Sequence, residues 1–117
     1  MSFDSDINRF AERTSLEMDT VIRKLVFDAH RMVTKKTPVD TGRARANWNV
    51  SVNTIDRSVN ENARGQQTPT LRTGDGLKTT YIVNSLPYIH ALETGSSKQA
   101  PNGMVAITIN ELRNSLK

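Results

Sequence analysis

Residues 37–48 read TPVDTGRARANW, and this stretch decides where the chain leaves its first helical region and enters its first strand. Pro38 stops the helix before it, because a proline pushes the preceding residue out of the helical conformation. Asp40 and Thr41 can bond their own following backbone amides, and Gly42 can take a left-handed conformation. The stretch therefore predicts a corner between a helix and a strand.

The residues after this corner alternate between apolar and polar. The apolar set is Ala44, Ala46, Trp48, Val50 and Val52, and the polar set is Arg43, Arg45, Asn47, Asn49, Ser51 and Asn53. A period of two predicts a strand with one buried face, which includes Trp48, and one outer face, which includes Arg43 and Arg45. Residues 79–84 are also β-prone, and we expect the two strands to pair antiparallel.

Before the corner, apolar residues recur every three or four positions through residues 4–36, with charged residues between them. This period predicts one long amphipathic helix. At about 1.5 Å per residue it would reach about 50 Å, more than a compact domain of this size spans. Thr14 and Ser15 are its weak stretch, so a short first helix followed by a main helix is the alternative.

The segment between the two strands, residues 54–79, is polar and almost free of large apolar groups. Loops of this length without structure of their own are usually functional or disordered. We predict a long flexible loop in which Leu71 and Leu77 are the apolar anchors.

Two further helices are predicted after the second strand. Pro87 opens a short one over residues 88–94, which Gly95 ends. A polar loop over residues 96–103 then leads to a C-terminal helix, although its first residues, MVAITI, could instead form a strand. The pattern predicts an α+β fold in which a long N-terminal helix packs on a small, mainly antiparallel sheet.

The composition predicts one domain with a thin core. Of the 117 residues, 36% are hydrophobic, against roughly 45–50% apolar residues in an average globular protein. We expect a single domain over residues 1–117 whose core neighbouring subunits help to complete. There is no cysteine, which excludes disulfides and thiolate metal sites. No apolar run reaches the roughly 18 residues of a membrane span, so no membrane association is expected.

The sequence offers no catalytic, metal or cofactor motif. His30 and His90 lie in predicted helices without a serine, cysteine or carboxylate at the spacing of a triad or a metal site. Glu93 follows His90 by three residues, which on a helix more often gives a surface contact than an acid–base couple. Nothing brings Asp40 and Glu93 together as a carboxylate pair. We expect a protein that is not an enzyme and needs no cofactor.

Basic residues gather in two places, and the formal net charge is +4. The first group, near the corner, is Arg31, Lys35, Lys36, Arg43 and Arg45, and the second, in the long loop, is Arg57, Arg64, Arg72 and Lys78. Such side chains suit backbone phosphates, but aromatic residues for stacking on single strands are scarce. A solvated edge is the favoured interpretation, and a small basic nucleic-acid-binding module is the alternative.

The corner TPVDTGRARANW is followed at a distance by YIVNSLPYIHALETGSSKQAPNGM, residues 81–104. This combination resembles the tail-completion and head-tail connector (neck) proteins of tailed bacteriophages, the family that includes the lambda minor tail protein Z type. Members carry a long N-terminal helix, a TPVDTGRLR-S/N-W corner, a Y-A-x-x-L/V-E-x-G segment and an AP-x-G segment before a final helix. Ala44 departs from this pattern, because a larger aliphatic residue is commoner there.

The resemblance implies a structural virion protein with an α+β fold, assembled as a ring, expected to be a hexamer, where the tail joins the capsid connector. Its implied partners are other copies of itself, connector or head-completion proteins, tail terminator or tail tube proteins, and DNA passing through the channel. It would be made in the host cytoplasm and reside in the virion at the head-tail junction. Candidate motif or interface residues are Thr41, Gly42, Arg43, Arg45, Trp48, Tyr88, Leu92, Glu93, Gly95, Ala100, Pro101 and Gly103. Candidate channel contacts to DNA are Arg57, Arg64, Arg72 and Lys78.

The resemblance leaves open what the two corner arginines contact. Arg43 and Arg45 would either face a neighbouring subunit and pair with carboxylates such as Glu93, or face DNA in the channel.

Overall fold

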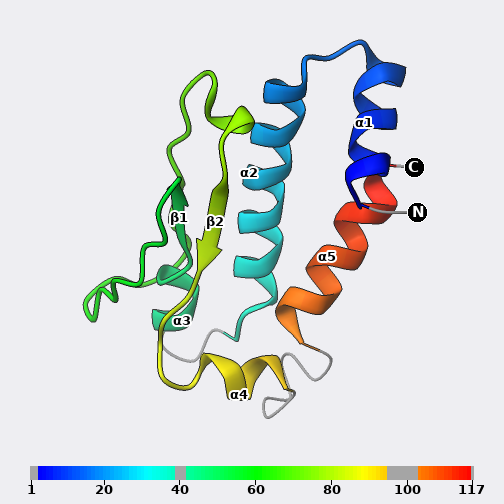
Figure 1. Ribbon diagram of the computed structural model, residues 1–117. Coiled ribbons are helices and arrows are strands. Elements are labelled where there is room, and N and C mark those ends of the chain that lie inside the picture. Colours follow the sequence, from blue (N-terminus) through cyan, green and yellow to red (C-terminus); the bar gives the residue numbers. More distant parts are fainter. Residues whose placement is uncertain (1–2, 39–41, 95–102, 117) are drawn as a thin grey trace.

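The computed structural model describes residues 3–38, 42–94 and 103–116, and it has the α+β architecture expected from the sequence (Figure 1). The elements in chain order are α1 (Phe3–Thr14), α2 (Met18–Lys36), α3 (Arg43–Ala46), β1 (Asn49–Val52), the 3-10 turn η1 (Asp75–Leu77), β2 (Thr80–Val83), α4 (Ile89–Glu93) and α5 (Met104–Ser115). Helix α2 lies in the middle, with the two strands on one side and α1 and α5 on the other (Figure 1). The predicted short helix and C-terminal helix are both present, and the strand alternative for MVAITI is wrong.

The N-terminal region forms two helices, so the prediction of one helix over residues 4–36 is wrong and the two-helix alternative is confirmed. The chain turns at residues 15–17, where Ser15 takes the left-handed conformation with φ 57°. Helix α1 then lies beside α5 (Figure 1). Folding back lets the apolar side of α1 pack on the rest of the same chain, which a straight helix of about 50 Å could not do in a molecule whose longest extent is 41 Å.

The corner starts as predicted and then differs from the prediction. Helix α2 ends at Lys36, just before Pro38, and Gly42 has the expected left-handed conformation with φ 74°. Arg43–Ala46 is one helical turn instead of the start of a strand, because the Ala46 amide donates to the Gly42 carbonyl at 3.1 Å. Arg43 and Arg45 therefore do not lie on the outer face of a strand.

The sheet consists of β1 and β2, which pair antiparallel as expected. The register aligns Asn49 with Val83 and Val52 with Thr80. All four residues of β1 are half-buried, so the predicted contrast between a buried and an outer face is absent along the strand itself. The predicted buried residues that are in fact buried all precede the strand: Ala44, Ala46 and Trp48, which are 5%, 6% and 7% exposed.

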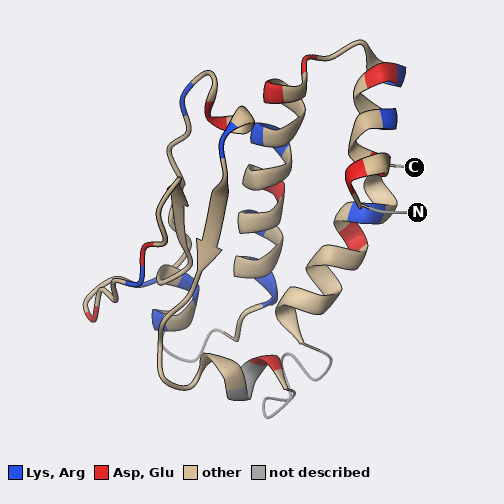
Figure 2. Cartoon of the chain, viewed as in Figure 1, with Lys and Arg blue, Asp and Glu red and all other residues tan. Residues whose placement is uncertain are grey.

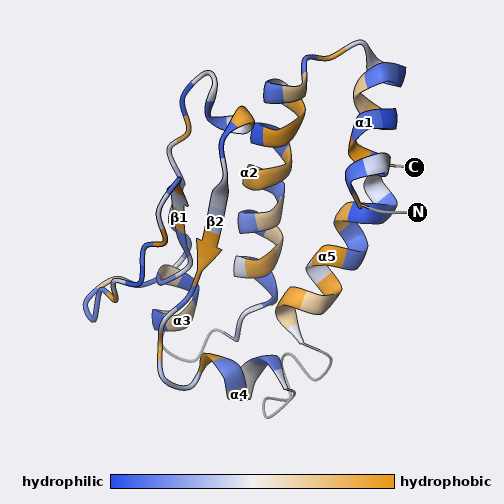
Figure 3. Ribbon diagram, in the orientation of Figure 1, coloured by the Kyte–Doolittle hydropathy of each residue, from blue (hydrophilic) through white to orange (hydrophobic). Residues whose placement is uncertain are grey.

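The core is thin and divided into two clusters, one near the start of α2 and one near its end. The first joins α1, α2 and the end of α5 through Ile7, Ala11, Val21 and Leu116. The second is formed by Val33, Trp48 and Met104, with Ile82 and Ile89 packed against it. Charged residues are spread over α1, α2, α5 and the loop (Figure 2), while apolar residues concentrate on α2, β2 and the first turns of α5 (Figure 3).

The long loop is held by polar contacts and not by the predicted apolar anchors. Leu71 is half-buried, but Leu77 is 70% exposed. Near the end of the loop, the buried Asp19 carboxylate of α2 accepts hydrogen bonds from the Gly74 amide at 2.9 Å and the Gly76 amide at 2.7 Å. These bonds, led by the one from Gly74, together with Arg23, lower the pKa of Asp19, so the ionised carboxylate is the form that holds the loop.

We predict that Gly76→Ala destabilises the protein by about 1–3 kcal/mol, the usual cost of an overpacked site. An added Cβ would overlap the backbone oxygen of Asp19 and lie 2.7 Å from its carboxylate, and the backbone cannot yield as a flexible side chain would. Urea denaturation measures the change. The neighbouring Leu77→Ala is the control and should have little effect, because that side chain is mostly in solvent. Equal stability of Gly76→Ala and the wild type would contradict the close packing of η1 on α2.

Candidate assembly site at the corner and the helix joint

The end of α2 is locked to the start of β1 by buried hydrogen bonds. The Trp48 indole Nε1 donates to the Thr37 hydroxyl at 2.9 Å, and that hydroxyl donates to the Val33 carbonyl at 2.6 Å. Thr37 is fully buried. Since these two bonds use the indole N–H and the hydroxyl together, they fix both the direction in which α2 ends and the orientation of the Trp48 ring.

Arg45 completes this end of α2. Its Nε donates to the Thr37 carbonyl at 2.7 Å and its Nη2 to the Lys35 carbonyl at 2.8 Å. The last carbonyls of a helix have no partner within the helix, and the helix dipole favours a cation there. Arg45 therefore serves as a cap for α2, a role that the sequence analysis missed because it placed this residue on a strand.

His30 is a structural residue of the same region. Its ring is 2% exposed, and Nε2 lies 3.1 Å from the Trp48 carbonyl, which can only accept, so the neutral ring donates from Nε2. Burial lowers the pKa of His30 against the smaller, opposite effect of that hydrogen bond. The ring joins the middle of α2 to the residue that precedes β1.

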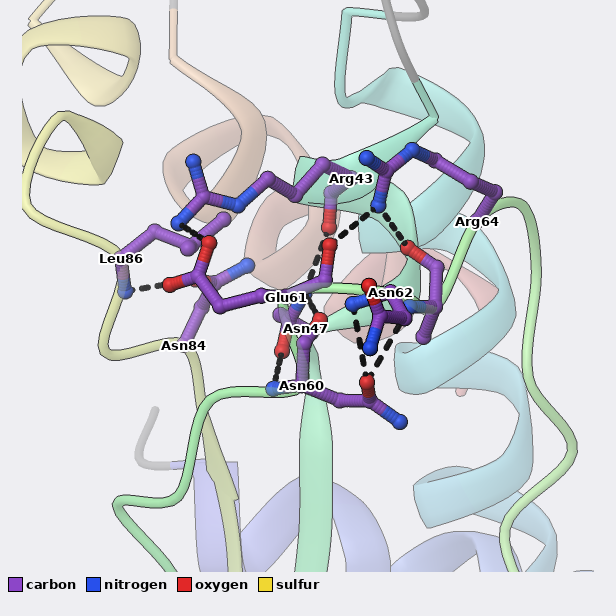
Figure 4. Close-up of polar contacts among 9 residues, drawn as sticks. Arg43, Asn47, Asn60, Glu61, Asn62, Arg64, Asn84 and Leu86 are labelled. Carbon is purple, nitrogen blue, oxygen red and sulfur yellow. Dashed lines mark hydrogen bonds and ion pairs between the residues drawn. The ribbon is translucent and has the colours of Figure 1, made fainter.

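Asn47 fastens the long loop to α3, as Figure 4 shows. Its Nδ2 donates to the Arg43 carbonyl at 2.8 Å and to the Asn60 carbonyl at 3.1 Å, and its Oδ1 accepts from the Asn60 amide at 2.7 Å. The side chain is 1% exposed. The alternating pattern predicts Asn47 on an outer strand face, and no local signal in the sequence reveals a partner thirteen residues away in a polar loop.

Arg43 lies between the loop and the segment before α4. Its guanidinium forms an ion pair with Glu61 (Figure 4), and it lies 6.0 Å from the centre of the Tyr88 ring. Within the described part of the chain, Glu61 is thus a carboxylate partner of Arg43. A cation at that distance from a ring is attracted by its π-face, so Arg43 brings Tyr88, a residue of the second motif, against the corner.

Gly42 lets the loop approach the corner closely. Its carbonyl accepts from the Gly65 amide at 2.9 Å, and a Cβ on Gly42 would lie 3.0 Å from that nitrogen. Together with its positive φ, this contact gives a physical reason for glycine at this position of the motif.

Glu93 and Gly103 meet at a second structural contact, here called the helix joint. Glu93 Oε1 accepts from the Val105 amide at 2.8 Å and Oε2 from the Ala106 amide at 3.2 Å. These amides belong to the first turn of α5, where helical N–H groups lack partners and a negative charge is favoured. Gly103 has φ 87°, and a Cβ there would lie 2.7 Å from Glu93 Oε2 and 2.8 Å from the Glu93 carbonyl oxygen.

The structure thus brings together Gly42, Arg43 and Tyr88 at the corner, and Glu93 and Gly103 at the helix joint. Trp48 and Arg45 lie at the end of α2, on the inner side of the same corner. The candidates Thr41, Gly95, Ala100 and Pro101 lie outside the described residues, as does Asp40, and the side chain of Leu92 is not described.

The predicted basic edge is largely engaged in contacts within the chain. Arg31 pairs with Asp28 at 3.3 Å and Lys36 with Glu111 at 2.8 Å. In the loop, the exposed Arg64 donates to the Glu61 and Ala63 carbonyls, and Lys78 lies 3.5 Å from Asp75. Arg57 and Arg72 are exposed. These cations are dispersed over the molecule and do not form one stripe (Figure 2).

A hollow of about 330 Å³ beside these elements contains no proton-transfer pair among its titratable lining residues, His30 and Asp56. The Asp56 carboxylate accepts from the Ser58 hydroxyl and amide, which lowers its pKa, while His30 is bonded to Trp48. Within the part of the chain that the structure describes, no three His, Cys, Asp or Glu residues are grouped as metal ligands. No described helix is long and apolar enough to cross a membrane.

Comparison of the chain with protein-family models, with curated proteins and with solved structures gave no match.

We predict that His30→Gln reduces the dependence of stability on pH between about 7.5 and 5.5. Because the folded pKa lies below the ordinary 6.5, the unfolded state takes up the proton first. The stabilisation by neutral His30 is therefore complete above the unfolded pKa and is lost as the pH falls through the lower folded pKa. Denaturation curves at several pH values measure this slope.

The exposed His90 provides the matched control for this experiment. His90→Gln should retain the wild-type slope, whereas His30→Gln should flatten it. An unchanged slope in His30→Gln would show that His30 does not carry the effect.

We also predict that Glu93→Ala lowers the free energy of unfolding by about 1 kcal/mol, the typical value of a helix cap. Gly103→Ala should cost at least as much, since it adds both strain at positive φ and overlap with Glu93. Circular dichroism during urea unfolding measures both. Glu111→Gln, on the same helix, removes only the exposed contact to Lys36 and should change stability by less than about 0.5 kcal/mol. If Glu93→Ala and Gly103→Ala were as stable as the control Glu111→Gln, the helix joint would be ruled out.

Proposed function

We propose that the chain is a structural virion protein that forms an oligomeric ring at the head-tail junction of a tailed phage and joins the tail to the capsid connector. The observation that carries this proposal is the helix joint. Glu93 and Gly103 belong to two separate motifs of the resemblance, and they contact each other directly. The described motif residues thus support the fold in the way expected of an architectural family, and among them no reactive group is surrounded.

The distribution of exposed apolar residues supports assembly through more than one face. Leu77, Tyr88 and Ile109 are all at least 38% exposed and belong to η1, the segment before α4, and α5. These elements lie at different edges of the molecule (Figure 1). A ring of identical subunits needs two different, complementary faces, whereas a two-fold dimer uses one patch twice. The pattern fits a ring, with further faces available to connector and tail proteins.

The alternative, a small basic nucleic-acid-binding module, has less support from the contacts. Phosphate binding requires cations that can reach a strand of nucleic acid. Arg43 and Arg45 instead hold the loop and the end of α2, and Lys36 pairs with Glu111. We therefore place DNA in the proposed function only as the molecule that passes through the ring, with the exposed Arg57 and Arg72 as the remaining candidate contacts.

Phage assembled without this chain should give filled heads and finished tails that fail to join. Electron microscopy of the lysate measures the fraction of joined particles, and supplying the wild-type chain in trans is the control that should restore them. The nucleic-acid module predicts a different defect, in DNA content or packaging, with joining intact. Normal joining in the absence of the chain would refute the proposal.

A further inference from the structure

The turn between α1 and α2 is formed by residues that do not favour it. The Ser15 amide donates to the Glu12 carbonyl at 3.3 Å and the Leu16 amide to the Ala11 carbonyl at 3.2 Å. This pair of bonds is a helix-ending motif whose left-handed residue is usually glycine. Here that residue is Ser15, for which a left-handed backbone is strained. Helix α2 then begins at Met18, and its N-cap residue Glu17 makes no side-chain capping bond.

The apolar stripe continues through this turn without a change of phase. Ile7 and Ala11 precede the turn, and Met18, Val21 and Leu25 follow it at steps of three, four and seven residues. Such spacing keeps all five residues on one side of a continuous helix. The break therefore follows neither from the hydrophobic pattern nor from strong stop signals.

Contacts from α1 to α2 and to the end of α5 help to hold α1 in place. Ile7 and Ala11 pack in one cluster with Val21 and Leu116. Arg13 Nη2 also donates to the Leu116 carbonyl at 3.0 Å. Every one of these partners exists in each copy of the chain, so α1 of a second copy could make the same contacts.

The packing of α1 on α2 and the end of α5 also leaves a gap. A hollow of about 210 Å³ lies among Phe10 of α1, Val21, Leu25 and Met32 of α2, and Leu116 after α5. Lys24, Asp28 and Arg31 also line this hollow, so it is partly polar. The side of α1 that faces the hollow has fewer atoms to contact, which lowers the dispersion energy that α1 gains in this position. The dispersion energy lost when α1 leaves this position is therefore smaller.

We propose that α1 is exchanged between neighbouring copies in the assembled protein. Residues 15–17 become helical, α1 and α2 form one helix of about 50 Å, and α1 packs on the α2 and α5 of the next copy. That length exceeds the 41 Å extent of the folded chain, so the straightened helix reaches beyond its own subunit. Exchange of an identical element is a low-cost route to assembly, and a short strained hinge favours it. The inference rests on the proposed function in that copies must meet in a ring.

Substitutions of Ser15 test the hinge in opposite directions. Ser15→Gly removes the strain of the turn and disfavours a helix, so it should reduce self-association of the purified chain. Ser15→Ala is strained in the turn and favours a helix, so it should raise the association constant at least about tenfold above Ser15→Gly. Light scattering coupled to size-exclusion chromatography measures both over a concentration series. Equal association of the two variants would overturn the proposal.

Disulfide cross-linking identifies which copy α1 contacts. Because the sequence has no cysteine, the introduced thiols are the only ones that can form a disulfide. Ala11→Cys on α1 and Val21→Cys on α2 place thiols in the same core cluster. The double variant, oxidised at low concentration, is the control that must give a bond within one chain. A mixture of the two single variants, each also carrying Ser15→Ala, should give a covalent dimer. Oligomers without such a dimer would show that association uses another face and would overturn the exchange.

The two readouts separate this inference from the proposed function. Exchange is measured on the purified chain as a disulfide between copies, and the proposed function as joined heads and tails in a lysate. Joining that depends on the chain, without any exchange dimer, would leave the function supported and this inference refuted. An exchange dimer from a chain that is dispensable for joining would give the opposite result.

Discussion

The hydrogen bond from the Trp48 indole to the Thr37 hydroxyl is the constraint on which the arrangement of the chain depends. It fixes the end of α2 against the residue before β1. The His30 ring, from the middle of α2, also bonds to Trp48, and Arg45 of α3 bonds to the Thr37 carbonyl at the end of α2. Because α2 has the sheet on one side and α1 with α5 on the other, its direction sets the position of every other element. The corner site is built on this fixed frame.

Local signals predicted the parts of the fold that depend on local chemistry. Pro38 marked the end of α2, Gly42 the left-handed residue, and Trp48 a buried side chain. The pattern Arg-Ala-Arg-Ala was misread because four residues fit one helical turn as well as a strand. Ser15 was noted only as a weak point, since the apolar stripe continues across it. The loop anchors were invisible to any periodic signal, because Asp19 meets its glycine partners more than fifty residues further along the chain.

The site residues divide in the same way. Sequence resemblance selected Gly42, Glu93 and Gly103, and each has a steric or hydrogen-bonding reason to be what it is. Asn47 and Glu61 could not be selected, because their importance arises from a loop that folds back on the corner. These internal contacts bear on the proposed role at the head-tail junction. In that role the internal contacts would hold the fold, and the outer faces would contact the partners.

The way in which the long loop is attached has a consequence for its sequence. Asn47 bonds to the backbone of Asn60, Asn49 to the carbonyls of Asp56 and Ser58, and Asp19 to backbone amides of the loop. Asn47, Asn49 and Asp19 thus bond to the main chain of the loop, and they do not contact most of its side chains. A few loop side chains do hold the path of the loop: Glu61 pairs with Arg43, and Asp56, Asn60 and Asp75 accept hydrogen bonds from amides of the loop itself. Apart from these residues and the glycine positions, the loop can change its amino acids while keeping its path. The residues that hold the loop are thus separate from the exposed side chains of the loop. Substitutions of those exposed side chains would change what the surface can bind without changing the fold.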